Sequence, residues 1–205
     1  MKVLAMAVLT VVAMSATGEV DARVRLVSDG RSDYRVIVGA DASPSERRAA
    51  AEFERFVEEM SGARLITAPD GPDVPPKAVL IGDSQALRAV APDLDLSGLG
   101  DEGYVIKTVG ERLVIAGGRL RGTMYGVYAF LEECLGCRWY SSKVSKIPRL
   151  PDIDITMIHL TGKPAFEYRD VFYTDAFDKD WAARNRTNGA TARLDASTGG
   201  KVAYY

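Results

Sequence analysis

The chain has 205 residues, of which 47% are hydrophobic and 26% are charged. This composition is typical of a folded globular protein and excludes disorder as the default state. Lys plus Arg (26) nearly balances Asp plus Glu (28), and the charges are interspersed along the chain. No basic face suited to a phosphate backbone is evident, so we expect no nucleic-acid partner.

The first 22 residues have the outline of a secretory signal peptide. Lys2 precedes the apolar run Val3 to Met14, and small and polar residues follow. Cleavage after Ser15, Ala16 or Ala22 would fit, while a buried first strand is the alternative. The run is shorter than the roughly 20 apolar residues that cross a bilayer, and no later segment qualifies. We therefore expect a secreted or periplasmic protein without a membrane span.

The next hundred residues alternate strands and helices. Residues 22–28 and 34–38 are predicted as strands around a polar turn, and a hairpin between them is plausible. Ser43-Pro44-Ser45-Glu46 starts a helix, which carries Ala50, Phe53, Val57 and Met60 at helical spacing and ends at Gly62. Strands follow at 64–68 and 77–81, and a short helix at 84–90. The apolar run of the second strand suits a strand covered on both faces.

Residues 103–136 predict a β-hairpin, a glycine-rich turn and a long apolar helix. Met124, Val127, Tyr128, Leu131 and Leu135 would line one face of that helix, which should stop at Gly136. The turn Gly117 to Thr123 lacks the spacing of a phosphate-binding loop. We interpret it as a tight turn that leads into a helix.

The two cysteines, Cys134 and Cys137, form a Cys-x-x-Cys pair at a helix end rather than at a helix start. A redox pair would favour the helix start, where the dipole lowers the thiol pKa. Buried small hydrophobic residues are the ordinary interpretation. A zinc site needs about four ligands, and His159 is the single histidine. We expect no metal and no cofactor.

The last third of the chain changes character after several prolines. An apolar strand is predicted at 153–158, a strand at Phe166 to Tyr173, and a helix from Asp178 to Arg186 around Trp181. A strand followed by a helix is how a (β/α) barrel begins. We expect the barrel to continue beyond Tyr205.

Several segments together resemble a known family: Gly103-Tyr-Val-Ile, Ile115-Ala-Gly-Gly, Arg121-Gly-Thr-Met-Tyr-Gly-Val-Tyr-Ala-Phe-Leu-Glu and Leu135-Gly-Cys-Arg-Trp-Tyr. They resemble the non-catalytic N-terminal domain of α-glucuronidases and β-N-acetylhexosaminidases, and are most similar to poorly characterised secreted proteins with this domain before a predicted hydrolase-like barrel.

The resemblance implies an α/β fold (an α+β sandwich) with a mixed or antiparallel sheet and two main helices on one face. The domains would be a signal peptide (1–22), an accessory domain (23–160) and the start of a truncated TIM-like barrel (161–205). The barrel would be an intramolecular partner of the accessory domain.

Three residues are candidates for substrate binding. Pro164-Ala-Phe166-Glu-Tyr-Arg169 resembles the first barrel strand of hexosaminidases, whose arginine contacts sugar hydroxyls, and this resemblance implies that role for Arg169. Asp175 would lie near the carboxyl end of that strand, where barrel sites form, although loop solvation is the ordinary role. Tyr173 offers a stacking face for a sugar, although core packing is common for such residues.

No catalytic residue is assigned, because glycoside hydrolysis needs two opposed carboxyl groups and the clustered Asp170, Asp175, Asp178 and Asp180 give no such pair. The relatives carry their acids on later barrel strands. We therefore expect the non-catalytic N-terminal part of a secreted glycoside hydrolase that acts on polysaccharide-derived oligosaccharides. Alternatives are a free-standing glycan- or protein-binding module and a thiol oxidoreductase.

Overall fold

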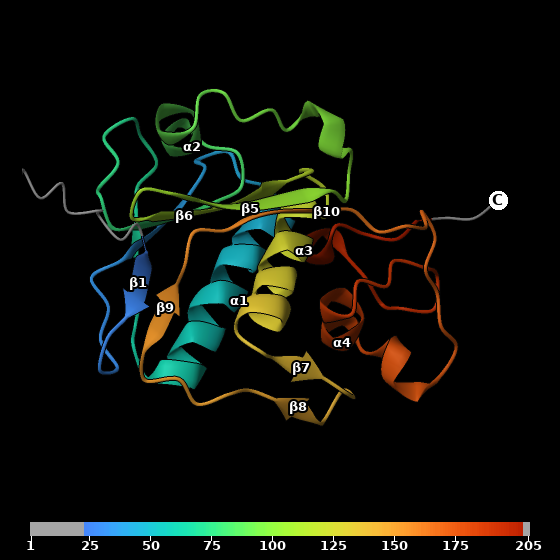
Figure 1. Ribbon diagram of the computed structural model, residues 1–205. Helices are drawn as coiled ribbons and strands as arrows, with labels where there is room; N and C mark the ends of the chain where they lie inside the picture. The colour runs from blue at the N-terminus through green and yellow to red at the C-terminus, as the bar shows by residue number, and fades with distance from the viewer. Residues whose placement is uncertain (1–22, 203–205) are drawn as a thin grey trace, which may run out of the picture.

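A computed structural model describes residues 23–202 and shows one six-stranded mixed sheet with helices on both faces (Figure 1). The strands β1–β9 and β7–β8 form two separate two-stranded pairs. The strands are β1 (Val24–Val27), β2 (Arg35–Val38), β3 (Ile66–Ala68), β4 (Ala78–Ile81), β5 (Tyr104–Val109), β6 (Arg112–Gly117), β7 (Arg138–Trp139), β8 (Ser145–Lys146), β9 (Ile153–Ile155) and β10 (His159–Gly162). The predicted mixed sheet is confirmed.

The helical segments separate the strands and extend to the C-terminal end of the described chain. They are α1 (Pro44–Ser61), α2 (Gln85–Val90), α3 (Gly122–Ala129) and α4 (Lys179–Arg184), with 3₁₀ turns η1 (Ser97–Leu99), η3 (Thr174–Phe177) and η4 (Ala196–Thr198) and a π turn η2 (Phe130–Cys134). None of the helices within residues 23–202 has the length and apolar character that crossing a membrane requires.

The main sheet has the strand order β10-β5-β6-β4-β2-β3. Strands β3, β2, β4 and β6 run parallel, whereas β5 pairs antiparallel with β6 and β10 pairs antiparallel with β5. The predicted hairpin is therefore β5–β6. Its register pairs Tyr104 with Gly117, which brings the residues before β5 next to the turn after β6.

Helix α1 starts as its sequence predicts. Ser43 and Glu46 form a capping box, Pro44 occupies the first turn, and Gly62 ends the helix with φ 81°. The capping box satisfies backbone N–H groups that the first helical turn leaves open, and Gly62 adopts the left-handed conformation at no steric cost. The predicted face is confirmed, because it is buried in the core, with members Ala50, Phe53, Val57 and Met60.

Helices α1 and α3 cover one face of the sheet, and α2 covers the other (Figure 1). Alternate residues of β4 therefore enter different cores. Val79 and Ile81 belong to the cluster under α1 and α3, whereas Ala78 and Leu80 belong to the cluster under α2. All four are buried, so the prediction of a strand covered on both faces is confirmed.

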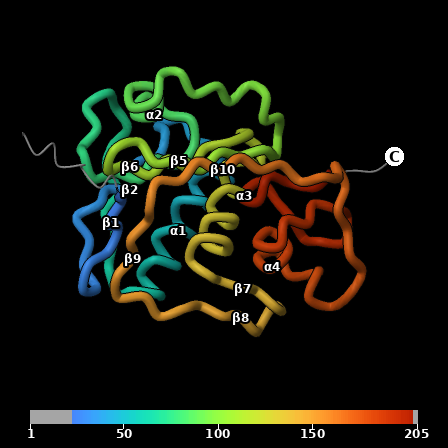
Figure 2. The backbone as a smooth tube through the Cα atoms, viewed as in Figure 1, coloured from blue at the N-terminus to red at the C-terminus, as the bar shows by residue number. Residues whose placement is uncertain are grey.

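Helix α3 is buried on every side, from Gly122 to Ala129, which corrects the prediction of a single apolar face. Tyr125 and Phe130, which are not members of that predicted face, are fully buried as well. Because α1, the sheet and the C-terminal segment surround the helix, no face meets solvent (Figure 2). The helical path ends before Gly136, whose φ of 78° is left-handed, as predicted.

The predicted hairpin between residues 22–28 and 34–38 is wrong. Strand β1 pairs antiparallel with β9, more than a hundred residues later, while β2 joins the main sheet. The bend at 28–31 closes with a local bridge from Ser28 to Arg31. A strand at 153–158 is confirmed only for Ile153–Ile155, because β10 follows as a separate strand on the main sheet.

The C-terminal segment, residues 163–202, contains the predicted helix as α4 and lies beside α3 (Figure 2). Phe166 to Tyr173 does not form the predicted strand. Its backbone instead binds the loop after α4, because Arg169 O accepts hydrogen bonds from the N–H groups of Asn188 and Gly189. Without a neighbouring strand among the described residues, an alternating pattern cannot make a sheet. The barrel stays a prediction.

Candidate functional site

A cluster of charged side chains gathers where the C-terminal segment meets the β5–β6 hairpin and α3. Glu102 lies two residues before β5 and is 9% exposed. One of its oxygens accepts hydrogen bonds from Arg121 Nε and Asn188 Nδ2, both at 2.8 Å. The other pairs with Arg169 Nη1 at 2.9 Å. Glu102 thus joins three parts of the chain that are distant in sequence.

The charge state of Glu102 follows from its partners. Burial alone would raise the pKa of its carboxyl, but hydrogen bonds from Arg169, Asn188 and Arg121 outweigh burial and hold the pKa below its usual value. Glu102 is therefore ionised at neutral pH. A general acid in glycoside hydrolysis needs a raised pKa, so Glu102 is unsuited to that role.

The glycine-rich turn places Arg121 against Glu102. A Cβ on Gly118 would lie 1.9 Å from the Gly100 carbonyl oxygen, so only glycine allows the turn to approach the loop before β5. The N–H groups of Arg121 and Gly122 both bind Asp101 O. Protein carbonyls therefore occupy these two amides, which would otherwise be available to an anion.

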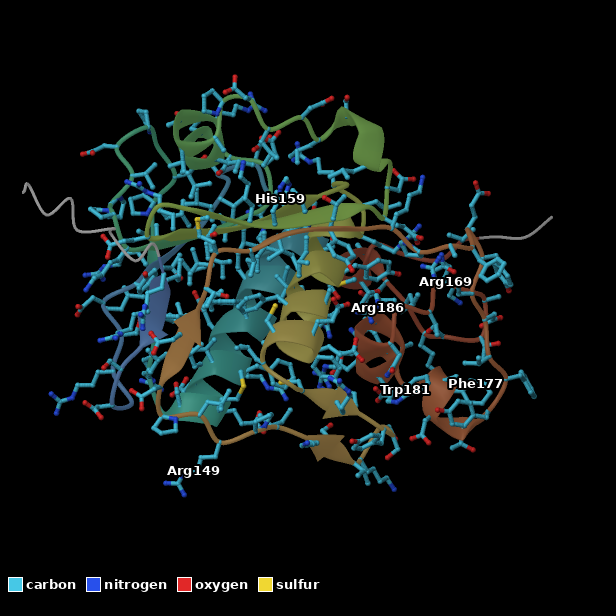
Figure 3. The ribbon with its side chains drawn as sticks, viewed as in Figure 1. Arg149, His159, Arg169, Phe177, Trp181 and Arg186 are labelled. Atoms are coloured by element: carbon cyan, nitrogen blue, oxygen red, sulfur yellow. The ribbon has the colours of Figure 1, made fainter. Side chains whose placement is uncertain are left out.

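Arg169, the candidate sugar ligand, is bound by protein groups. Besides Glu102, it donates from Nε to Arg186 O at 2.7 Å, from Nη1 to Phe166 O, and from Nη2 to Tyr125 Oη at 3.4 Å. Its side chain is 18% exposed. Figure 3 shows Arg169 on the C-terminal segment with Arg186 nearer to α3. In this structure Arg169 holds the segment in place, and its predicted contact with substrate stays a prediction.

Tyr173 and Asp175 have other partners. The Tyr173 ring meets Trp181 edge-on, with centroids 5.4 Å apart. Asp175 Oδ1 accepts hydrogen bonds from Ser142 N at 2.7 Å and Ser142 Oγ at 2.5 Å, which fasten η3 to the β7–β8 connection and lower the pKa of Asp175. The three candidates thus have separate protein partners, and their roles in binding stay predictions.

A pocket of about 260 Å³ lies beside the Glu102 cluster. Its lining is mainly charged: Asp101, Glu102, Arg121, Lys163, Glu167 and Val202. Among residues 23–202, every carboxyl with a resolved shift has a lowered pKa: Asp41, Asp95, Glu102, Asp170, Asp175, Asp180 and Asp195. None of these seven carboxyls has the raised pKa that a general acid uses.

A second ionic cluster was missed from the sequence. Glu52 of α1 is 7% exposed and accepts from Arg184 of α4 at 2.9 Å, while Arg48 pairs with Asp180 at 2.8 Å. Tyr128 Oη of α3 donates to Glu52 at 3.3 Å. The one signal was the spacing of Glu52, which is three residues after Ala49 and four before Phe56 on the buried side of α1.

The cysteines do not form a redox centre in this structure. Both are free, Cys134 is exposed, and Cys137 is buried beside Met60. Burial, reinforced by nearby Glu59, raises the pKa of Cys137 to about 11, opposite to the shift that activates a thiol. No group of three or more His, Cys, Asp or Glu side chains within residues 23–202 is arranged to hold a metal ion.

The comparisons with solved structures identify similar folds. BtGH115A, a family GH115 4-O-methyl-α-glucuronidase with specificity for decorated arabinogalactans, aligns with a TM-score of 0.50 and 18% identity over 70% of this chain and 19% of its own. CpGH84D aligns with a TM-score of 0.52 and 9% identity over 80% of this chain and 27% of its own. The chain thus spans less than a third of either protein, and at these identities the likeness concerns the fold.

The comparison with protein families gives a match to the sequence of this chain. Residues 24–130 match the family described as glycosyl hydrolase family 67 N-terminus, and the match includes both main helices and the β5–β6 hairpin. No curated protein sequence matches the chain significantly. The predicted resemblance to an α-glucuronidase-type N-terminal domain is confirmed. Because the match covers more than half of the chain, this protein belongs to the glycosyl hydrolase family 67 N-terminus family.

Proposed function

We propose that this chain is the non-catalytic N-terminal part of a secreted, α-glucuronidase-like glycoside hydrolase that acts on polysaccharide-derived oligosaccharides. The observation that carries the proposal is the family match over residues 24–130. In this proposal the accessory layer braces a catalytic barrel, and the barrel contributes the two carboxyl groups that cleave the glycosidic bond.

The state of the carboxyl groups supports a non-catalytic role. Glu102, the buried acid beside the 260 Å³ pocket, is held ionised by two arginines and an amide. A nucleophile needs a free oxygen directed at the substrate, and both oxygens of Glu102 already have protein partners. In the same arrangement, the Glu102 carboxylate joins the loop before β5 to α3 and to the C-terminal segment.

An apolar surface on the C-terminal segment supports the presence of a further domain. Phe166 is 73% exposed and Phe172 is 87% exposed. Val171, Tyr173 and Phe177, which are less exposed, add to this apolar surface. Exposed apolar residues that gather in one stretch of chain mark interaction surfaces, whereas an autonomous module would cover them. In the proposal, this surface packs against the barrel as its intramolecular partner.

The test compares two proteins. The first is the 205-residue chain, and the second is the product of the complete reading frame that contains it. Both are assayed with glucuronoxylan oligosaccharides and with aryl glycosides, including an aryl β-N-acetylglucosaminide, by chromatography of the released sugars. We expect no turnover above blank for the 205-residue chain, and release of glucuronic acid by the longer product.

Two outcomes would contradict the proposal. Hydrolysis by the 205-residue chain that disappears in Glu102→Gln would place the chemistry within the described residues. A complete reading frame without a barrel, together with glycan binding but no hydrolysis, would instead favour the free-standing binding module. Release of N-acetylglucosamine in place of glucuronic acid would correct the substrate class.

A further inference from the structure

The main sheet ends at β10, and the outer side of this strand is open. β10 pairs with β5 on one side, and no strand of residues 23–202 pairs with its other side. In Figure 2 the path through β10 crosses in front of the sheet, and no other segment passes in front of it. The opposite edge, β3, is three residues long and is followed directly by Pro69, which has no N–H to donate. β10 is therefore the edge that a further strand can extend.

The register of β10 determines which of its backbone groups face outward. Thr108 N donates to Ile158 O at 3.1 Å, immediately before β10 begins. In an antiparallel ladder, residue pairs that exchange backbone hydrogen bonds alternate with pairs that do not. Every second residue after Ile158 therefore bonds toward β5. The N–H and C=O groups of the residues between them, His159 and Thr161, point away from β5 and form a second, unused ladder.

The side chains along this edge are uncharged. No Asp, Glu, Lys or Arg occurs in residues 155–162, although 26% of the chain is charged. Charged side chains, lysine above all, are the usual protection of an exposed edge against pairing. Leu160 is 38% exposed and lies on the same face of the sheet as Ile158, which packs against the core under α1 and α3. Figure 3 shows His159 on the other face, the side of α2.

The same edge of a second copy is the partner that fits this one. An antiparallel edge is its own complement, because a two-fold axis places each donor of one copy opposite an acceptor of the other. With the axis at Leu160, His159 of one copy lies opposite Thr161 of the other. Lys163 then lies opposite Met157, which is 74% exposed. This register uses the uncharged stretch almost to its full length, and no like charges face each other.

We infer that the chain forms a two-fold dimer in which two copies of β10 pair antiparallel and join the two main sheets into one. His159 and Thr161 exchange backbone hydrogen bonds with the other copy, and the two Leu160 side chains meet at the axis. Because the pairing uses the β10 edge of both copies, the assembly closes at two chains. The inference concerns assembly and goes beyond the proposed function.

The test is the mass of the 205-residue chain in sedimentation equilibrium at about 1 to 200 µM, a range that covers a weak interface. We expect the mass to rise with concentration from that of one chain toward that of two. Leu160→Glu and Leu160→Lys should each stay monomeric, because like charges would meet at the axis. An equimolar mixture of these two variants should recover the dimer, because opposite charges then meet there.

Two proline variants test the backbone ladder. Thr161→Pro removes an outward N–H, so it should abolish the dimer and leave the fold of the single chain intact. Leu160→Pro is the matched contrast, because it removes an N–H that bonds to β5. It should lower the temperature of thermal unfolding at concentrations where the wild type is monomeric. Circular dichroism checks the fold of every variant.

Phe172→Glu is the control for an added charge. Phe172 is 87% exposed on the apolar surface of the C-terminal segment, which could also bring two chains together. This variant should leave the dimer intact. A dimer that is lost in Phe172→Glu and kept in Leu160→Glu would assign the interface to that surface and overturn the inference.

Three other results would overturn it. A mass of one chain at every concentration would leave the β10 edge without a second copy. A folded Thr161→Pro that still forms the dimer would exclude the backbone ladder, and a mixture of Leu160→Glu with Leu160→Lys that stays monomeric would exclude the axis at Leu160. No turnover is measured, so this result and the hydrolase proposal fail or succeed separately.

Discussion

Glu102 and Arg169 form an ion pair at 2.9 Å between the loop before β5 and the C-terminal segment. The same carboxylate binds Arg121 at the start of α3 and Asn188 after α4. One acidic side chain is therefore the shared counter-charge of two guanidinium groups and also accepts a hydrogen bond from an amide, in a largely buried location. Its removal would leave two buried or half-buried cations without a counter-charge, whereas removal of either arginine would leave Glu102 with the remaining partners.

That asymmetry gives a prediction for stability. Glu102→Gln should lower the free energy of unfolding by about 3–5 kcal/mol, because uncompensated buried charge is costly. Arg169→Gln should lower it by about 1.5–3 kcal/mol, the usual cost of losing a hydrogen bond to a charged group. Urea denaturation of both variants measures the difference. Arg64→Gln, which breaks the exposed pair with Glu58, is the control and should have no measurable effect.

The same reasoning applies to the double variant. Because Glu102 and Arg169 are direct partners, the effects of Glu102→Gln and Arg169→Gln should not add in the combined protein. Additive effects would show that the interaction between Glu102 and Arg169 contributes nothing to the free energy of unfolding. Equal costs for the two single variants would contradict the central position of Glu102.

Stability should depend on pH through Glu102. Its pKa in the folded protein is lower than the usual 4.5, so the unfolded chain takes up the proton first as the pH falls. The contribution of Glu102 is therefore complete above about pH 4.5 and is lost as the pH decreases through the folded pKa. Urea denaturation from pH 7 to pH 3 should show a shallower decline for Glu102→Gln than for the wild type. Parallel declines would mean that other carboxyls dominate the acid transition.

The sequence predicted the features that depend on local chemistry. The cap at Ser43, the end at Gly62 and the β5–β6 hairpin follow from residue types within a few positions of each other. The pairing of β1 with β9 was not predictable, because the choice of strand partner is decided by packing across more than a hundred residues. A pattern of alternating residues also cannot show whether a partner strand exists. For this reason the prediction of a strand at residues 166–173 was wrong.

The charged clusters were beyond sequence reasoning for the same reason. Glu102 and Asn188 are 86 residues apart, and Glu52 and Arg184 are 132 apart. A single sequence carries no local signal that these side chains meet. The resemblance did single out Arg169 as a residue with a specific role, but the structure gives it protein partners. Its choice of partner depends on how the C-terminal segment packs against α3.

The two cysteines should react very differently. Cys137 is buried and its pKa is raised to about 11, so almost none of it is thiolate at pH 8. Cys134 is exposed, although burial of its sulfur and nearby Glu133 also raise its pKa. Iodoacetamide with mass spectrometry on the native protein should label Cys134 slowly and leave Cys137 unmodified until urea unfolds the chain. Rapid native labelling of Cys137, or a disulfide between the two, would revive the oxidoreductase hypothesis.

The turn at Gly117–Gly122 gives a steric prediction. A Cβ on Gly118 would meet Gly100 O at 1.9 Å and the Asp101 carbonyl carbon and oxygen at 2.5 and 2.6 Å. Backbone cannot move aside as a flexible side chain can, so Gly118→Ala should cost at least about 1–3 kcal/mol, the usual penalty for overpacking. Gly98→Ala is the matched control, because a Cβ at Gly98 has no described neighbour within 4 Å. Thermal unfolding of the two proteins should separate them by several degrees. If Gly118→Ala unfolds at the temperature of the control, the loop before β5 can move away, and Arg121 is not held against Glu102 by this turn.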